Sequence, residues 1–187
     1  MFLLAAAGLA LASVVLTGGR MPGLLVLRIR WAWLLVVALA LQVLAITVFP
    51  HSGRAVVATM HAASYAIAGF VVFANRAVRG VPTIGLGGLL NAVAIAANGG
   101  TMPASSSALT TAGLTSSSAG FENSAVLVNP NLSFLGDVFA IPASWPFNNV
   151  FSVGDILIAF GAAVLLHFAC GSRLVRSPAA VGLFRWC

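Results

Sequence analysis

Residues 31–49, WAWLLVVALALQVLAITVF, decide the fold class that this sequence predicts. The stretch is apolar almost throughout, and Gln42 is its only strongly polar residue. A helix that crosses the hydrocarbon core of a bilayer needs about 20 mostly apolar residues. The stretch also lacks the alternation of apolar and polar residues that marks a strand of an outer-membrane barrel. It therefore predicts a transmembrane helix.

Four more apolar stretches have the same character, and the composition agrees with them. Hydrophobic residues make up 60% of the 187 residues and charged residues only 6%, where a soluble domain carries about 25% charged residues. We therefore expect an all-α integral membrane protein with a single transmembrane domain, a bundle of five helices, over residues 1–187. The predicted spans are 2–16, 31–49, 55–74, 83–97 and 153–170, with an outer loop at 98–152.

The basic residues, all nine of them arginines, predict an orientation for this bundle. Eight lie in alternate connections and the tail, at positions 20, 28, 30, 76, 79, 173, 176 and 185, and only Arg54 lies in the remaining loops. Positive charge accumulates on the cytoplasmic side of membrane proteins. The N-terminus is then outside and the C-terminus cytoplasmic, in a multi-pass protein of a bacterial inner membrane.

The distribution of the arginines also predicts partners. Clustered arginines attract anionic membrane lipids on the cytoplasmic face. They are divided among three segments without an interleaved aromatic patch, so we expect no nucleic-acid partner. We expect another membrane protein as a further partner.

The long region between the fourth and fifth predicted helices divides into two parts. Residues 104–124 are rich in Ser, Ala, Thr and Gly and predict a flexible exposed loop. Residues 132–141 are mostly apolar but too short to span a bilayer. They predict a short interfacial or re-entrant helix on the outer face.

Three short motifs carry a resemblance to a known family. They are Asn98-Gly-Gly-Thr-Met-Pro103, Phe134-Leu-Gly-Asp137 and Ser152-Val-Gly-Asp155, and Asn91 precedes them. Their order resembles the uncharacterised bacterial membrane family called domain of unknown function 5317. The resemblance covers most of the chain. It implies a membrane topology and a choice of candidate residues, but no activity.

These motifs supply the candidate site, a polar cluster at the outer mouth of the bundle. Its predicted members are Asn91, Asn98, Gly99, Gly100, Asp137, Asp155 and, from the third predicted helix, His61. An ionisable residue inside a membrane helix is a functional candidate by default.

Each member of the cluster also has a purely structural interpretation. Asn98-Gly99-Gly100 has the pattern of a helix stop, and Asp155 lies three residues after Ser152, as in a capping box. Asp137 could cap the short outer helix or pair with Arg54. Asn91 and His61 could bond to neighbouring helices.

Cofactor and metal chemistry find little support in the sequence. The three histidines, His51, His61 and His167, are too far apart for a local metal motif. We expect no cofactor and assign no catalytic residue. Asp137 and Asp155 each follow a glycine, which leaves an intramembrane aspartyl protease as a remote alternative.

Two functions from different classes remain. The first is a non-catalytic accessory or scaffold subunit of a larger membrane complex, favoured because the chain has no cofactor motif and few ionisable groups. The alternative is a small transporter or channel that uses the polar cluster as an outer vestibule. Substitution of Asp155 separates the two, because a scaffold depends on it only for stability.

Overall fold

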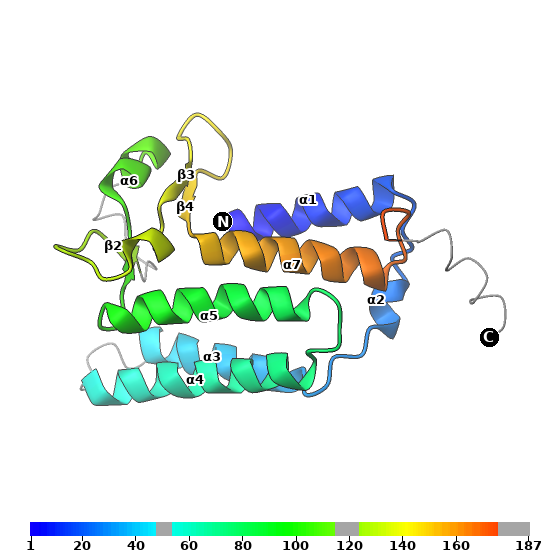
Figure 1. Cartoon of the computed structure of the whole chain (residues 1–187), viewed down its shortest axis with the longest axis horizontal. Coiled ribbons are helices and arrows are strands. Elements are labelled where there is room, and N and C mark those ends of the chain that lie inside the picture. Colours follow the sequence, from blue (N-terminus) through cyan, green and yellow to red (C-terminus); the bar gives the residue numbers. More distant parts are fainter. Residues whose placement is uncertain (48–53, 115–123, 176–187) are drawn as a thin grey trace.

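Five long helices form the body of the computed structural model, which describes residues 1–47, 54–114 and 124–175. Each helix lies in one of the apolar stretches of the sequence, and Figure 1 shows them side by side with their axes roughly parallel. A short helix, α2 (Gly23–Val26), lies between the first two. The long helices are α1 (Phe2–Leu16), α3 (Trp33–Thr47), α4 (Arg54–Ala74), α5 (Val81–Ala97) and α7 (Val153–Ala169).

The centre of the bundle is the antiparallel pair of α5 and α7, whose backbones touch. A methyl group on Gly87 would collide with the carbonyl oxygen of Gly154 and with Ile158. One on Gly161 would collide with the backbone of Gly80 and Ile84. Glycine is the residue that allows two backbones to approach this closely. The glycines of the two helices thus set the spacing on which the polar contacts below depend.

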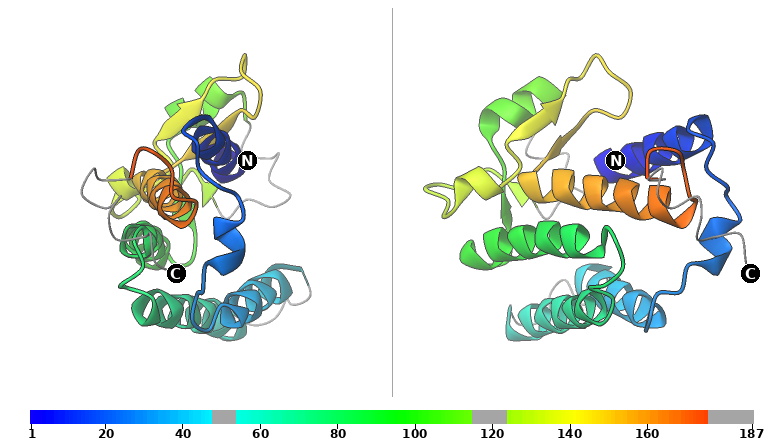
Figure 2. Two further views of the ribbon diagram at one scale, coloured as in Figure 1. Left: turned by 90° about the vertical axis from the view of Figure 1, so that its right-hand side faces the viewer. Right: turned by 45° about the vertical axis from the view of Figure 1, so that its right-hand side comes forward.

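The other helices are arranged in sequence around this pair. Helix α1 packs on α7, while α3 packs mainly on α4, and α4 contacts α5. The end-on view in Figure 2 shows this order from α1 on one side to the α3–α4 pair on the other. The fully buried apolar residues are few and mostly small, such as Val14 on α1, Ala45 on α3 and Ala94 on α5. Much of each helix surface therefore stays exposed.

The helix lengths contradict the predicted five-span membrane bundle. Helices α1 and α3 have 15 residues and α5 and α7 have 17. At about 1.5 Å per residue all four fall short of a hydrocarbon core about 30 Å thick. Helix α4 has 21 residues, but its first half includes polar residues such as His61 and Ser64.

Within the described ranges, no helix combines the length and the apolar character that crossing a bilayer requires. The predictions of a multi-pass protein, of a bacterial inner-membrane location and of an outside N-terminus with a cytoplasmic C-terminus are therefore wrong. One local reason is visible at α3. Trp31 adopts a φ of 62°, so the helix starts at Trp33 and loses the beginning of the predicted stretch.

The region between α5 and α7 also differs from its prediction, because it contains strands. Strand β1 (Met102–Pro103) pairs in parallel with β2 (Ser124–Ala125). Strand β3 (Phe139–Ile141) pairs in antiparallel fashion with β4 (Asn149–Phe151), and Phe139 lies opposite Phe151. The two phenylalanine rings stack at 5.5 Å between centroids.

The expected outer helix at 132–141 is therefore wrong. Only η1 (Ser133–Leu135), one 3₁₀ turn, forms there before Gly136 and the strand. The preceding Ser-rich part was predicted to be a loop, yet it contains α6 (Ser106–Ala112). Helix α6 forms because Ala108, Leu109 and Ala112 share one helix face and are buried.

Candidate functional site

Asn91, Ser152 and Asp155 form a closed hydrogen-bonded network between α5 and the start of α7. Asn91 Nδ2 donates to Asp155 Oδ1 at 2.9 Å, and Ser152 Oγ donates to Asn91 Oδ1 at 2.8 Å. Ser152 N donates to Asp155 Oδ2, and Asp155 N donates to Ser152 Oγ, both at 3.0 Å. The last two bonds confirm the capping box predicted from the spacing of Ser152 and Asp155.

This network connects two helices through hydrogen bonds. Both carboxylate oxygens of Asp155 accept hydrogen bonds, and the carboxylate lies in the first turn of α7, where the helix dipole favours negative charge. Ser152 is fully buried. Because Asn91 on α5 bonds to both Ser152 and Asp155 at the start of α7, the network holds the two helices in register.

Asn98 forms a second joint at the end of α5. Its Nδ2 donates to the carbonyl oxygens of Ala94 and Asn131, each at 2.8 Å, and its Oδ1 accepts from Asn131 N at 2.8 Å. Helix α5 ends at Ala97, and Gly99 and Gly100 follow with φ of 67° and 99°. The helix-stop interpretation of Asn98-Gly-Gly is thus confirmed, and Asn98 ties this stop to the loop before η1.

Asp137 belongs to the small strands and not to the α5–α7 network. It is buried, its Oδ2 accepts from Ser124 Oγ at 2.5 Å, and its backbone pairs with Pro103 and Ser105. Among the described side chains no hydrogen bond links Asp137 to Asn91 or Asp155. The proposed pairing with Arg54 falls on a side chain outside the described ones.

His61 is separated from the rest of the predicted cluster because it lies in α4, which packs on α3. It is half-buried, and its carbonyl oxygen accepts from Ser64 Oγ at 2.8 Å. Ser64 Oγ in turn accepts from Gln42 Nε2 on α3. The structure therefore brings together Asn91 and Asp155, and it places Asn98, Asp137 and His61 in three other environments.

Sequence reasoning missed a buried polar cluster at the opposite end of α7. His167 Nδ1 lies 2.6 Å from Ser172 Oγ, and His167 Nε2 lies 3.0 Å from Ser13 Oγ on α1. Ser13 Oγ donates to the carbonyl of Ala10, which leaves it to accept from Nε2–H. In the tautomer with the proton on Nε2, Nδ1 accepts from Ser172 Oγ. No motif could have shown this contact, because Ser13 and His167 are 154 residues apart.

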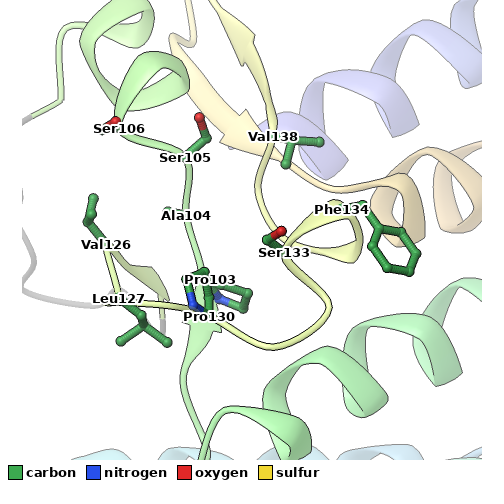
Figure 3. A pocket seen from close by; sticks show the side chains of 10 residues that line it. All are labelled: Pro103, Ala104, Ser105, Ser106, Val126, Leu127, Pro130, Ser133, Phe134 and Val138. Carbon is green, nitrogen blue, oxygen red and sulfur yellow. The ribbon is translucent and has the colours of Figure 1, made fainter.

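A cavity of about 370 Å³ lies beside the small strands (Figure 3). It is bounded by apolar side chains together with the hydroxyl-bearing residues Ser105, Ser106 and Ser133. No charged side chain is among its lining residues. None of its lining residues belongs to the predicted cluster, although Ser105 N donates to the carbonyl of Asp137.

Comparison with known families identifies the family of this chain. Residues 26–167 match the model described as a family of unknown function, DUF5317. Since the match covers well over half of the 187 residues, the chain belongs to that family. This confirms the resemblance carried by the Asn-Gly-Gly and Gly-Asp motifs. No curated protein and no solved structure matches the chain.

Proposed function

We propose that this protein is a non-catalytic accessory or scaffold subunit that docks onto a membrane protein within a larger complex. The observation that carries the proposal is a pair of exposed apolar helix faces. Val36, Leu39 and Val43 on α3 have 68%, 60% and 42% of their surface exposed. Leu86, Leu89 and Val93 on α5 have 50%, 59% and 41% exposed.

The spacing of these residues supports helix docking. Each trio follows the pattern i, i+3, i+7, which places its members on one helix face. Apolar residues at this spacing are the ones that insert between the side chains of a facing helix. Exposed apolar patches of this kind mark interaction sites in proteins.

Because the two helix faces are apolar, we expect the partner to present an apolar surface. Neither trio includes a charged or hydrogen-bonding side chain, so affinity has to come from apolar burial. At about 25 cal/mol per Å² of apolar surface removed from water, covering either face stabilises a complex. Apolar helices, which membrane proteins carry in abundance, are the matching surface.

The polar network fits a structural role within such a subunit. The groups that a solute would have to contact, in Asn91 and Asp155, already bond to each other and to Ser152. Their contribution is to fix α5, and with it the exposed face formed by Leu86, Leu89 and Val93.

The experiment is a purification of the tagged full-length chain from whole cells extracted with mild detergent, with identification of the co-purifying proteins. We expect a stoichiometric partner that the Val36→Gln/Leu39→Gln variant no longer retains. The matched control is Val126→Gln/Val128→Gln, which changes residues that are 48% and 93% exposed outside the helices. That control should retain the partner.

Two outcomes would contradict the proposal. One is purification of the chain alone or only as a homo-oligomer. The other is a partner that is retained equally by the α3 variant, by a Leu86→Gln/Leu89→Gln variant of α5 and by the control. Circular dichroism of each variant establishes that its helices have formed.

A further inference from the structure

Six exposed arginines lie at one end of the described structure. We call this surface the basic end. The six come from four separate segments, namely the connections before α2, before α3 and before α5 and the segment after α7, which meet at the right-hand end of Figure 1 and face the viewer in the left part of Figure 2. They are Arg20, Arg28, Arg30, Arg76, Arg79 and Arg173.

Hydrogen bonds hold these segments together. Arg20 N donates to the carbonyl of Cys170 at 2.8 Å, and Arg173 N donates to the carbonyl of Thr17 at 3.0 Å. Arg30 N donates to Asn75 Oδ1 at 2.8 Å, and Asn75 Nδ2 donates back to the carbonyl of Arg30 at 2.9 Å. These bonds join the four segments in two pairs, the connection before α2 to the segment after α7, and the connection before α3 to the one before α5.

No acid of the described residues neutralises this surface. The two described acids are Asp155, at the first turn of α7, and Asp137, beside the strands at that same end of the bundle. Helix α7 has 17 residues and separates them from the basic end by about 25 Å. Charges that far apart are screened, since the Debye length is about 8 Å at physiological ionic strength.

Exposed aromatic and aliphatic side chains lie among the arginines. Trp31 and Trp33, which directly follow Arg30, are 48% and 59% exposed. Leu25 and Val26 on α2 are 89% and 75% exposed. Tryptophan beside arginine is the combination found where proteins meet the headgroup layer of a bilayer, and exposed leucine adds apolar contact there.

We propose that the basic end docks onto a surface of anionic lipid headgroups. The guanidinium groups contact the lipid phosphates, while Trp31, Trp33 and Leu25 enter the headgroup layer. Such docking needs no helix that spans the bilayer. A nucleic acid also presents phosphates, but its backbone would leave Leu25 and Val26 in water. The surface is separate from the helix faces proposed for protein docking, so each proposal can fail without the other.

The test is flotation of the full-length chain with vesicles of phosphatidylcholine alone and of phosphatidylcholine mixed with phosphatidylglycerol. We expect stronger partition into the anionic vesicles, and we expect the difference to shrink as salt is added. Each arginine near the surface contributes about a fivefold increase in partition. An Arg28→Gln/Arg30→Gln variant should therefore lower partition into anionic vesicles about 25-fold and leave partition into neutral vesicles unchanged.

The control variant is Arg54→Gln, which removes one positive charge at the first residue of α4, while Arg76 follows the other end of that helix. The partition of this variant should change less than about twofold, because the start of α4 lies further from the basic end than the Debye length. Inorganic phosphate at the same phosphate concentration should not displace the vesicles, since one phosphate reaches few of the arginines.

Four results would overturn the proposal. They are equal partition into both kinds of vesicle, an Arg54→Gln effect as large as that of the Arg28/Arg30 pair, full displacement by inorganic phosphate, and tighter binding to a DNA duplex than to anionic vesicles at equal phosphate concentration. The last of these would assign the basic end to nucleic acid.

Discussion

Asn91 on α5 donates a hydrogen bond of 2.9 Å to Asp155 on α7, across 64 residues of sequence. The same amide accepts from Ser152 on its other side, at 2.8 Å. A methyl group on Gly154 would collide with the Asn91 side chain, so the amide lies directly against the backbone of α7. One asparagine thus connects the cap of one helix to the body of another.

Replacing Asp155 with Asn should lower stability. The new amide retains one acceptor oxygen and places an NH₂ group against either Ser152 N or Asn91 Nδ2, which are both donors. We expect a loss of about 1–3 kcal/mol in the free energy of unfolding, measured by chemical denaturation. In a double-mutant cycle with Asn91→Ala the two effects should be non-additive by at least about 0.5 kcal/mol. Additive effects would mean that the two side chains do not interact.

The close approach of α5 and α7 predicts opposite results for two adjacent glycines. Gly87→Ala should destabilise the protein by about 1–3 kcal/mol, because its methyl group would meet the backbone of α7. Gly88→Ala should be neutral or stabilising by up to about 1 kcal/mol, because its methyl group meets nothing and alanine favours the helix. Thermal unfolding of the two variants is the measurement. Equal melting temperatures would show that the helices are further apart than described.

His167 should contribute to stability through its two hydroxyl partners. His167→Ala leaves a cavity and deprives the fully buried Ser172 hydroxyl of its partner. We expect a loss of about 2–4 kcal/mol in unfolding free energy. Ser172→Ala removes one bond and should cost less, about 1–3 kcal/mol. If neither variant changes the denaturation midpoint, His167 has a role other than holding α1 against α7.

Tyr65 should make stability depend on pH in the alkaline range. Burial raises the pKa of this phenol above its ordinary value of 10.0, since desolvation disfavours the charged form. At a pH between the unfolded and the folded pKa, the folded state therefore retains the proton that the unfolded chain has released. The contribution of Tyr65 to stability is complete below the unfolded pKa and is lost as the pH rises through the folded pKa. The melting temperature of the parent protein should fall there more steeply than that of Tyr65→Phe, and parallel curves would contradict this.

The parts of the structure that were predictable from sequence are those set by local pattern. The capping box follows from the spacing of Ser152 and Asp155, and the end of α5 follows from Asn98-Gly-Gly. The apolar stretches locate the five long helices to within two residues at each described end. The positive φ of Trp31 shortens α3, and no apolar-run argument includes such a break. The inference that an apolar stretch spans a bilayer failed for all the described helices, because none is both long and apolar enough.

The candidate site was predictable only in part, because its contacts are long-range. The structure brings Asn91 and Asp155 together, and their contact depends on the glycines that bring α5 and α7 close. His61 was grouped with them by assumed depth in a bilayer, and the packing of α4 on α3 separates it. No pattern in the sequence around Ser13 or around His167 indicates that the two side chains meet.

Asn75 holds Arg30 with two hydrogen bonds through its side chain, and its Nδ2 also donates to the carbonyl of Val71 at the end of α4. This single buried amide fastens the connection that enters α3 to the connection that leaves α4. The two ends of the α3–α4 hairpin are therefore fixed to each other by one side chain. Both connections therefore depend on one polar side chain and not only on the apolar contacts between the helices.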